Sequence, residues 1–328
     1  MRRLLYLLIG IITLTLFFYF INPRETWEGI KQIRVSYLII GYFFFFISHG
    51  IKFYRWGLIL EKIKKVPFLK IFEYYWASQF INNFMPLRIG EVTKSLFLKK
   101  DYDIDISSSM STVIVDRFYG IIVRLSVVLL IPFLDTELFS YLRNYLIYII
   151  CLNAILLFFI IVLLIRYQSF MLIINKLFFF LPRSWNQRLV SFFETSVVAI
   201  KKIHLQKKDI CIFTALSVLG LLTQALLVYF LFKSVGIVIP ISIYIITITI
   251  MDFFAMLPSP PASIGTTEWY TNIVYTVGLG ISKNTVASIT LVSHAINLFI
   301  IGILGMICLI AMGQGMFIRG RVDVQTQV

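Results

Sequence analysis

The sequence predicts an all-α polytopic membrane protein, a single transmembrane domain over residues 1–328 with about six full transmembrane helices and two re-entrant broken-helix hairpins. Composition is the first observation: 59% of the residues are hydrophobic, 14% are charged and the mean hydropathy is +0.89, which is more apolar surface than one soluble core can hide. The second observation is that apolar runs of roughly 20 residues, the length of a helical crossing, recur along the chain. The third is a pair of polar segments, each with proline and glycine, that interrupt apolar sequence.

Six apolar runs are long enough to cross a membrane as helices. The first follows Arg2 and Arg3, and because no small-residue cleavage site comes after it, we interpret it as a retained span rather than a signal peptide. Two further runs, 71–85 and 241–257, lead directly into the polar segments, and the second of these is also long enough to cross outright. The six predicted crossings are 4–21, 36–60, 113–134, 145–165, 210–232 and 285–312.

Lysine and arginine residues indicate which loops of this cell-membrane protein face the cytoplasm. Basic residues occur at Arg2 and Arg3, at Lys52 and Arg55, along 166–208 and after the last apolar run. We therefore expect both termini to be cytoplasmic. The basic, aromatic segment 166–208 is either one or two amphipathic helices on the cytoplasmic leaflet or a solvated loop packed on the bundle. If each polar segment returns to the side it entered from, residues 36–134 and 210–312 form an inverted repeat.

The first polar segment places amides and charges inside apolar sequence. Pro86 lacks a backbone donor and Gly90 favours other backbone angles, so a continuous helix is not expected here. A helix beginning near Glu91 would direct its positive end inward, where cationic side chains could hold a phosphate or another anionic headgroup. Alternatively, the cations lie at the membrane interface and Glu91 caps its own helix. The candidate substrate-binding residues of this segment are Asn82, Asn83, Arg88, Glu91 and Lys94.

Asp116, Arg117 and Arg124 lie inside the predicted crossing 113–134. Arg117 and Arg124 are seven residues apart and therefore share one helical face. Charged side chains inside a crossing are costly, so we expect these arginines to pair with Glu91 or Asp116 and to contact a lipid phosphate. A structural ion pair that holds helices together is the alternative for Asp116 and Arg117.

The second polar segment repeats the order of proline, a short polar run, glycine and glutamate. Glu268 is a candidate proton or cation carrier or a partner for an arginine, and capping of its own helix is the alternative. Asp252 and His294 are lone titratable residues in apolar runs, and His294 serves either a proton-coupled step or a hydrogen-bonded core. We expect Glu91 and Glu268 to approach a common midplane cavity, with Arg117 near both. The residues predicted to break the helix are Pro258, Pro260, Pro261 and Gly265.

Catalytic and metal-binding motifs are missing from the sequence. It has no HExxH, GxSxG, P-loop, dinucleotide or zinc pattern, and its three cysteines each lie in an apolar run. We therefore expect no catalytic residue, no metal site and no cofactor. The net charge of +14 comes from loops that flank apolar runs, which favours membrane orientation and contact with anionic lipids over nucleic-acid binding.

The polar segments resemble those of a known family, the lysylphosphatidylglycerol synthase transmembrane (flippase-like) family, and the likeness covers nearly the whole chain. The family's second motif usually has paired glycines where this chain has only Gly265, and His294 stands where the family often has arginine. The residues that carry the resemblance are the run 82–91 with Lys94, the pairs Arg55-Trp56 and Asp116-Arg117, and the segment from Pro260 to Glu268.

The resemblance implies a helical bundle that moves an aminoacylated phospholipid or a related lipid-linked anion between leaflets. Larger members carry a soluble acetyltransferase-like domain that transfers lysine from charged tRNA to phosphatidylglycerol. The present sequence ends at Val328, soon after the last apolar run, so we expect no enzymatic activity from it.

We therefore expect flippase-type translocation of an anionic or aminoacylated phospholipid, or of a lipid-linked intermediate. One alternative is a non-catalytic accessory subunit that binds lipid-phosphate intermediates in envelope glycolipid synthesis. Its partners would be an envelope-synthesis enzyme or a second copy of the chain. The other is lysylphosphatidylglycerol synthesis, which would require a separate soluble domain.

Overall fold

The computed structural model describes residues 2–85, 89–134, 148, 150, 151, 153–155, 158, 203, 205–255 and 259–325, with side chains between residues 10 and 313. Every regular element in these ranges is helical. The chain is therefore an all-α membrane protein, as the composition predicts.

The helices of the first half form around short, well-defined breaks. Asn22 caps the second helix with its side chain, which accepts hydrogen bonds from the backbone N–H groups of Arg24 and Glu25, and Pro23 occupies the first helical position. Asp103 ends α5 in the left-handed conformation, with φ of 51°. The six helices are α1 (Arg2–Phe20), α2 (Pro23–Lys31), α3 (Val35–Glu61), α4 (Phe68–Phe84), α5 (Gly90–Tyr102) and α6 (Ile106–Leu134).

From α3 to α6 the chain forms a long helix, a short helix, a break, a short helix and a long helix. The second half repeats this order. Its elements are α11 (Lys207–Ser234), α12 (Ile241–Phe254), the 3-10 turn η2 (Pro261–Ser263), α13 (Thr266–Asn272), the π-helical turn η3 (Ile273–Val277) and α14 (Lys283–Gln325).

The predicted crossings coincide with long helices wherever the structure describes them. The runs 4–21, 36–60, 113–134, 210–232 and 285–312 correspond to α1, α3, α6, α11 and α14. Among the described residues, three helices are long and apolar enough to cross a membrane: Val35–Glu61, Lys207–Ser234 and Lys283–Gly313. The predicted crossing 145–165 and the amphipathic segment 166–208 lie almost entirely outside the described residues.

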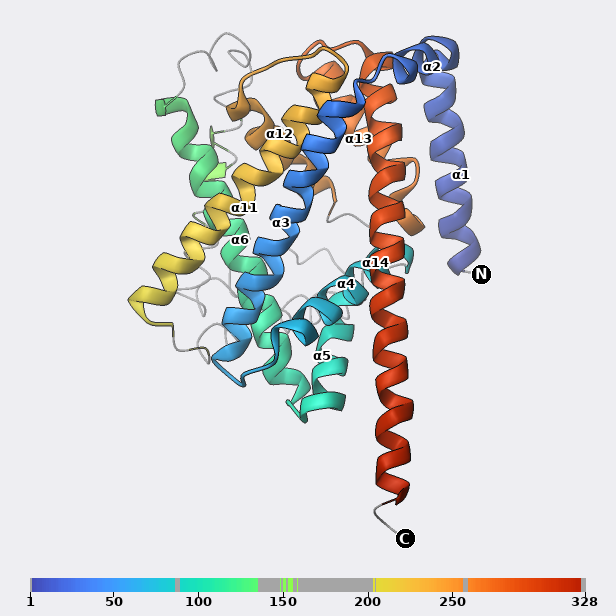
Figure 1. Cartoon of the computed structure of the whole chain (residues 1–328). Coiled ribbons are helices and arrows are strands. Elements are labelled where there is room, and N and C mark those ends of the chain that lie inside the picture. Colours follow the sequence, from blue (N-terminus) through green and yellow to red (C-terminus); the bar gives the residue numbers. More distant parts are fainter. Residues whose placement is uncertain are drawn as a thin grey trace, which may run out of the picture.

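Helices α3 and α11 form an antiparallel pair at the centre of the bundle. The N–H of Arg34 donates to the carbonyl of Ser234 at 3.0 Å, and Lys62 pairs with Asp209 at 2.6 Å at the opposite end. In Figure 1 the two helices run in opposite directions, α4 and α5 lie toward one end of the bundle, and α12 and α13 lie toward the other. That the halves 36–134 and 210–312 form an inverted repeat across the membrane stays a prediction.

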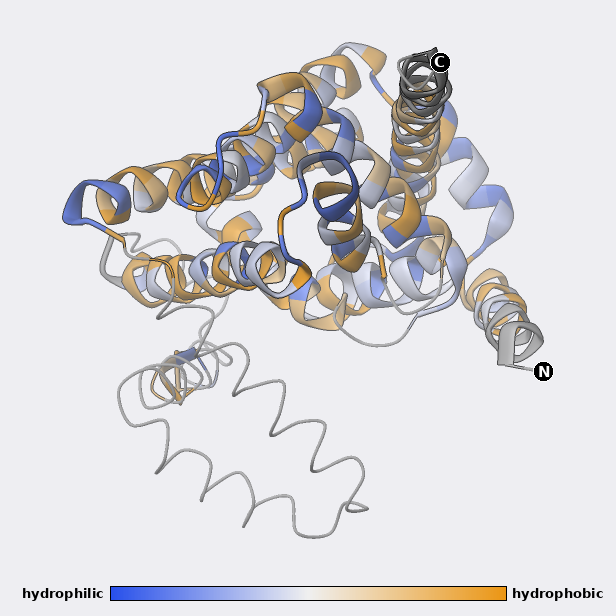
Figure 2. Cartoon of the chain, turned by 90° about the horizontal axis from the view of Figure 1, so that it is seen from below, coloured by the Kyte–Doolittle hydropathy of each residue, from blue (hydrophilic) through white to orange (hydrophobic). Residues whose placement is uncertain are grey.

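Hydrophilic residues gather at the ends of the helices and in their connections, whereas the bodies of the helices are mostly hydrophobic (Figure 2). Large apolar side chains remain exposed along these bodies, among them Phe43 and Phe299, which are 61% and 68% exposed. Such surfaces are stable against lipid chains, where contact with water is not required.

The first break brings the start of α5 against the side of α4. A Cβ atom on Gly90 would lie 2.1 Å from the carbonyl oxygen of Ser78 and 2.6 Å from Oδ1 of Asn82, so only glycine permits this approach. Helix α4 ends at Phe84 and α5 begins at Gly90, so two separate helices flank this segment. Pro86 and Arg88 lie outside the described residues.

The second break is extended, tightly turned and packed against α1. Pro260 has φ of −56° and ψ of 162°, and its ring lies beside Gly10. Ala262, Ser263 and Gly265 follow with φ of 58°, 52° and 80°, and a Cβ on Gly265 would lie 2.3 Å from Oγ1 of Thr13. Pro261 begins the 3-10 turn, and Pro258 lies outside the described residues.

Replacing Gly90 by alanine is expected to destabilise the protein by roughly 1–3 kcal/mol, because the new methyl group meets backbone rather than a movable side chain. Thermal unfolding in detergent measures the effect. Gly313→Ala is the matched control, since a Cβ there meets no atom within 4 Å. Equal unfolding temperatures for the two variants would contradict the close packing of α5 on α4.

Candidate functional site

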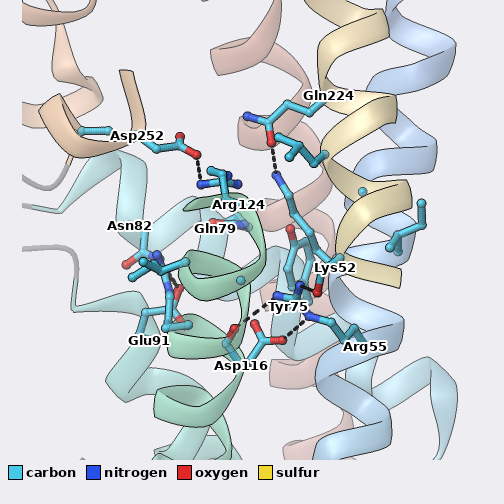
Figure 3. A pocket seen from close by; sticks show the side chains of 18 of the residues that line it. Lys52, Arg55, Tyr75, Gln79, Asn82, Glu91, Asp116, Arg124, Gln224 and Asp252 are labelled. Atoms are coloured by element: carbon cyan, nitrogen blue, oxygen red, sulfur yellow. Dashed lines mark hydrogen bonds and ion pairs between the residues drawn. The ribbon is translucent and has the colours of Figure 1, made fainter. Parts of the chain in front are cut away.

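A cavity of about 300 Å³ lies among α3, α4, α5, α6, α11 and α12 (Figure 3). Its wall combines side chains from both halves of the chain, including Ser263 of the second break. Its charged lining residues are Lys52, Arg55, Glu91, Lys94, Asp116, Arg117, Arg124 and Asp252.

The carboxylate of Glu91 binds three donors from three helices. Arg117 of α6 donates to Oε1, as does Nδ2 of Asn82 of α4 at 3.1 Å, and Lys94 of α5 donates to Oε2 at 2.9 Å. The predicted pairing of Arg117 with Glu91 is therefore present. The Arg117 side chain lines the cavity and is 54% exposed.

Lys94 has little capacity left for a ligand. It is 6% exposed, it donates to Glu91, and its ammonium lies 4.9 Å from the Trp56 ring centre and 5.3 Å from that of Tyr75. These aromatic faces stabilise a cation electrostatically. Lys94 therefore holds Glu91 in place rather than presenting its charge to the cavity.

Arg55 and Asp116 form a second, buried pair. Nε of Arg55 donates to Oδ1 of Asp116 at 2.7 Å, and Nη1 donates to Oγ of Ser217 at 2.6 Å. A Cβ on Gly120 would lie 3.3 Å from Nη2 of Arg55, which is tighter than usual. This pair joins α3, α6 and α11, and it corresponds to the structural alternative predicted for Asp116, with Arg55 rather than Arg117 as the partner.

Arg124 pairs with Asp252 and so connects α6 to α12. Its Nε is buried and has no hydrogen-bond partner among the described residues. The sequence suggested Glu91 or Asp116 as its partner. However, Glu91 already binds Arg117 and Lys94, and Asp116 binds Arg55.

Lys52 is the cavity's least compensated cation. Its ammonium donates to Oε1 of Gln224 at 3.3 Å, whereas the described ion pairs of the cavity carboxylates are all with other cations. The cavity wall carries five cationic and three acidic side chains, an excess of two positive charges. A cavity with this balance attracts an anion.

The remaining predicted residues divide between the cavity and a second cluster. Asn82 and Asn83 line the cavity, Asn82 with a buried Oδ1 that lacks a partner in the described part of the chain, and Asn83 with Nδ2 donating to the carbonyl of Gln79 at 2.9 Å. Glu268 and His294 do not line it. The described contacts therefore do not bring Glu268 to Arg117 as expected.

Glu268 and His294 instead form a buried pair between α13 and α14. Nδ1 of His294 lies 2.6 Å from Oε1 of Glu268, and Nε2 lies 2.9 Å from the carbonyl oxygen of Ala262. Glu268 is 3% exposed. Because α13 packs against α1 and α14, the carboxylate of Glu268 contacts the last helix rather than α6.

Sequence reasoning missed Lys52, Arg55 and Asp252 as cavity residues. The sequence predicts Lys52 and Arg55 to be cytoplasmic; in the structure both lie inside α3, well before its end at Glu61, and both line the cavity. Their position inside the predicted run 36–60 was the available signal. Within the residues that the structure describes, no group of three or more His, Cys, Asp and Glu side chains could hold a metal ion.

A family model described as the lysylphosphatidylglycerol synthase transmembrane region matches residues 3–305. The chain is also similar to a UPF0104 membrane protein of Methanocaldococcus jannaschii, with 23% identity over 190 residues, which are 58% of this chain and 76% of the relative. No solved structure matches it.

Removing one partner of the Arg55–Asp116 pair is expected to be costly. Asp116→Ala leaves a buried guanidinium without its carboxylate, and we expect a loss of roughly 3–5 kcal/mol in stability. The double variant Arg55→Met, Asp116→Leu removes both charges and should recover most of the unfolding temperature. Glu28→Gln, which removes an exposed ion pair with Lys31, is the control and should change little. A double variant no more stable than Asp116→Ala would contradict this account.

Proposed function

Because the chain belongs to the lysylphosphatidylglycerol synthase transmembrane family, we propose that it translocates an anionic or aminoacylated phospholipid, or a related lipid-linked intermediate, between membrane leaflets. The observation that carries the proposal is the cavity's excess of two positive charges, enclosed by helices of a membrane protein. Uncompensated charges are costly at membrane depth, so a phosphate-bearing headgroup would stabilise this wall.

Arg117 and Lys52 are the residues proposed to bind the phosphate. Arg117 lines the cavity and uses one nitrogen on Glu91, which leaves further guanidinium donors for a ligand. On binding, Lys52 would exchange its contact with the neutral Gln224 for a charge-assisted hydrogen bond to the phosphate. The carboxylates of Glu91 and Asp252 supply acceptors for the amine of an aminoacyl group, which is how one cavity would accommodate both headgroup classes.

The proposed route for the lipid follows from the two breaks. The first break borders the cavity through Asn82 and Asn83, and the second borders it through Ser263. In a multi-pass cell-membrane protein with both termini in the cytoplasm, these segments would enter from opposite sides. The headgroup would then pass between them while the acyl chains remain in lipid.

The charged side chains of the cavity bind and position in this proposal, and no catalytic step is assigned to the chain. The partner is membrane lipid rather than nucleic acid. An accessory subunit in envelope glycolipid synthesis would bind the same phosphate through the same residues without moving it, as part of a complex with an envelope-synthesis enzyme or a second copy. A lysyltransferase would require a separate soluble domain.

Reconstitution of the purified chain into vesicles tests the proposal. Fluorescent phosphatidylglycerol, its lysyl ester and a zwitterionic lipid are each placed in both leaflets, and a membrane-impermeant quencher reports the exchange rate. We expect faster exchange for the anionic or aminoacylated lipid than in protein-free vesicles. Competition by added glycerol phosphate would indicate that the headgroup is recognised. Unchanged exchange for every lipid, together with tight lipid binding in detergent, would favour the accessory role.

Lys52→Gln is expected to lower the exchange rate of anionic lipid about tenfold, the loss of roughly one charge-assisted hydrogen bond. Glutamine keeps a polar side chain beside Gln224 but removes the charge. Lys65→Gln is the matched control, because the Lys65 side chain is 87% exposed on the surface and lies outside the cavity. Equal exchange rates for the two variants would exclude Lys52 as a headgroup ligand.

A further inference from the structure

The Glu268–His294 pair lies apart from the charged cavity wall and has a geometry of its own. Its two contacts, 2.6 Å from Nδ1 to the carboxylate and 2.9 Å from Nε2 to the Ala262 carbonyl, use both ring nitrogens. The side chains are 4% and 12% exposed, for glutamate and histidine respectively. A buried acid–imidazole pair of this kind either fixes the fold or carries a proton.

The contacts determine how many protons the pair must hold. The Ala262 carbonyl is an acceptor, so Nε2 must carry a hydrogen and donate it. Nδ1 and Oε1 at 2.6 Å then need a proton between them, because two lone pairs would repel at that distance. The arrangement therefore holds one titratable proton, carried either by His294 or by Glu268.

The second oxygen of Glu268 favours the neutral form of the pair. Oε2 is buried and has no hydrogen-bond partner among the described residues. An ionised carboxylate would leave that oxygen charged and unsolvated, whereas a protonated carboxyl donating from Oε1 to Nδ1 leaves only a carbonyl there. The proton is thus a ligand that this buried site needs.

The same pair holds the second break in an unfavourable backbone conformation. Ala262 and Ser263 have φ of 58° and 52°, which side-chain-bearing residues rarely adopt. His294 bonds the carbonyl of Ala262, and the next residue, Ser263, lines the charged cavity. A movement of the His294 ring would therefore displace the peptide between Ala262 and Ser263, and with it this part of the cavity wall.

Other charged groups near the pair have partners of their own. On the packed elements, Asp252 of α12 binds Arg124, Lys283 of α14 donates to the carbonyl of Phe20, and Lys70 of α4 binds Glu73. Residues 10–20 of α1 carry no charge. Within residues 10–313, the other ionisable side chains on these elements are tyrosines and one cysteine: Tyr19, Tyr74, Tyr75, Tyr244, Tyr270, Tyr275 and Cys308.

We propose that Glu268 and His294 form a proton-binding site whose occupancy holds the second break against the cavity, so that proton release frees this part of the wall. Loss of the shared proton places the lone pair of Nδ1 against a carboxylate, which opens the pair and releases Ala262. The coupling of this movement to lipid transport rests on the proposed function, whereas the proton site itself does not.

A cysteine at position 263 reports the movement. Cys151, Cys211 and Cys308 are first replaced by serine or alanine, and Ser263→Cys is then labelled by a water-soluble maleimide across a range of pH. The matched variant adds Glu268→Gln, whose amide can donate to Nδ1 without titrating. Every thiol reacts faster as pH rises, so the comparison between the two removes that common slope. We expect an additional step in the parent that is lost in the Glu268→Gln variant; superimposable profiles would overturn the proposal.

An infrared measurement on the otherwise unchanged chain guards against a variant that folds poorly. The parent should show a protonated-carboxyl band that disappears as pH rises and is missing in Glu268→Gln. If the band is missing in the parent at every pH, the pair is a fixed ion pair and the proposal fails.

Lipid exchange under an imposed proton gradient separates this inference from the proposed function. Gradient-dependent exchange in the parent and gradient-independent exchange in Glu268→Gln would support the coupling. A labelling step without any lipid exchange would leave the proton site standing and refute translocation. Exchange that ignores the gradient, without a labelling step, would refute the proton site and leave translocation standing.

Discussion

The carboxylate of Glu91 is the contact on which the cavity depends, because it binds side chains of α4, α5 and α6 at once. It can do so only because Gly90 allows the start of α5 to reach α4. A single carboxylate thereby joins the helices on both sides of the break to α6 and fixes one wall of the cavity. The lysine that pairs with it is itself packed against Trp56 and Tyr75, so the carboxylate cannot turn away without losing this ion pair.

The other ion pairs fix the helices around this point. Arg55 and Asp116 join α3 to α6 and reach α11 through Ser217, while Arg124 and Asp252 join α6 to α12. Together they compensate most charges that enter the apolar interior. The excess positive charge is carried mainly by Lys52, whose described partner is neutral, and by the half-exposed Arg117, and both side chains line the cavity.

Hydropathy and breaking residues predict much of this fold, since the lengths of apolar runs and the positions of proline and glycine are local properties. The break between Phe84 and Gly90 and the pairing of Arg117 with Glu91 could be predicted from one stretch and its neighbour. The partners of Arg124 and Arg55 could not, because Asp252 is 128 residues from Arg124 and Ser217 is 162 residues from Arg55. The sequence predicts Lys52 to be cytoplasmic, because a basic residue near the end of an apolar run usually lies on that side of the membrane.

The two breaks differ in chemistry although their order of elements is the same. In the first, a carboxylate pairs with an arginine and a lysine, so two cationic side chains compensate its charge. In the second, the corresponding carboxylate faces an imidazole and keeps one oxygen without a partner among the described residues, so its charge depends on a single proton. If the halves move relative to each other during transport, the first break would keep the headgroup's electrostatic environment constant. Only the second could then be released by a change in protonation, and the asymmetry would give the movement a direction.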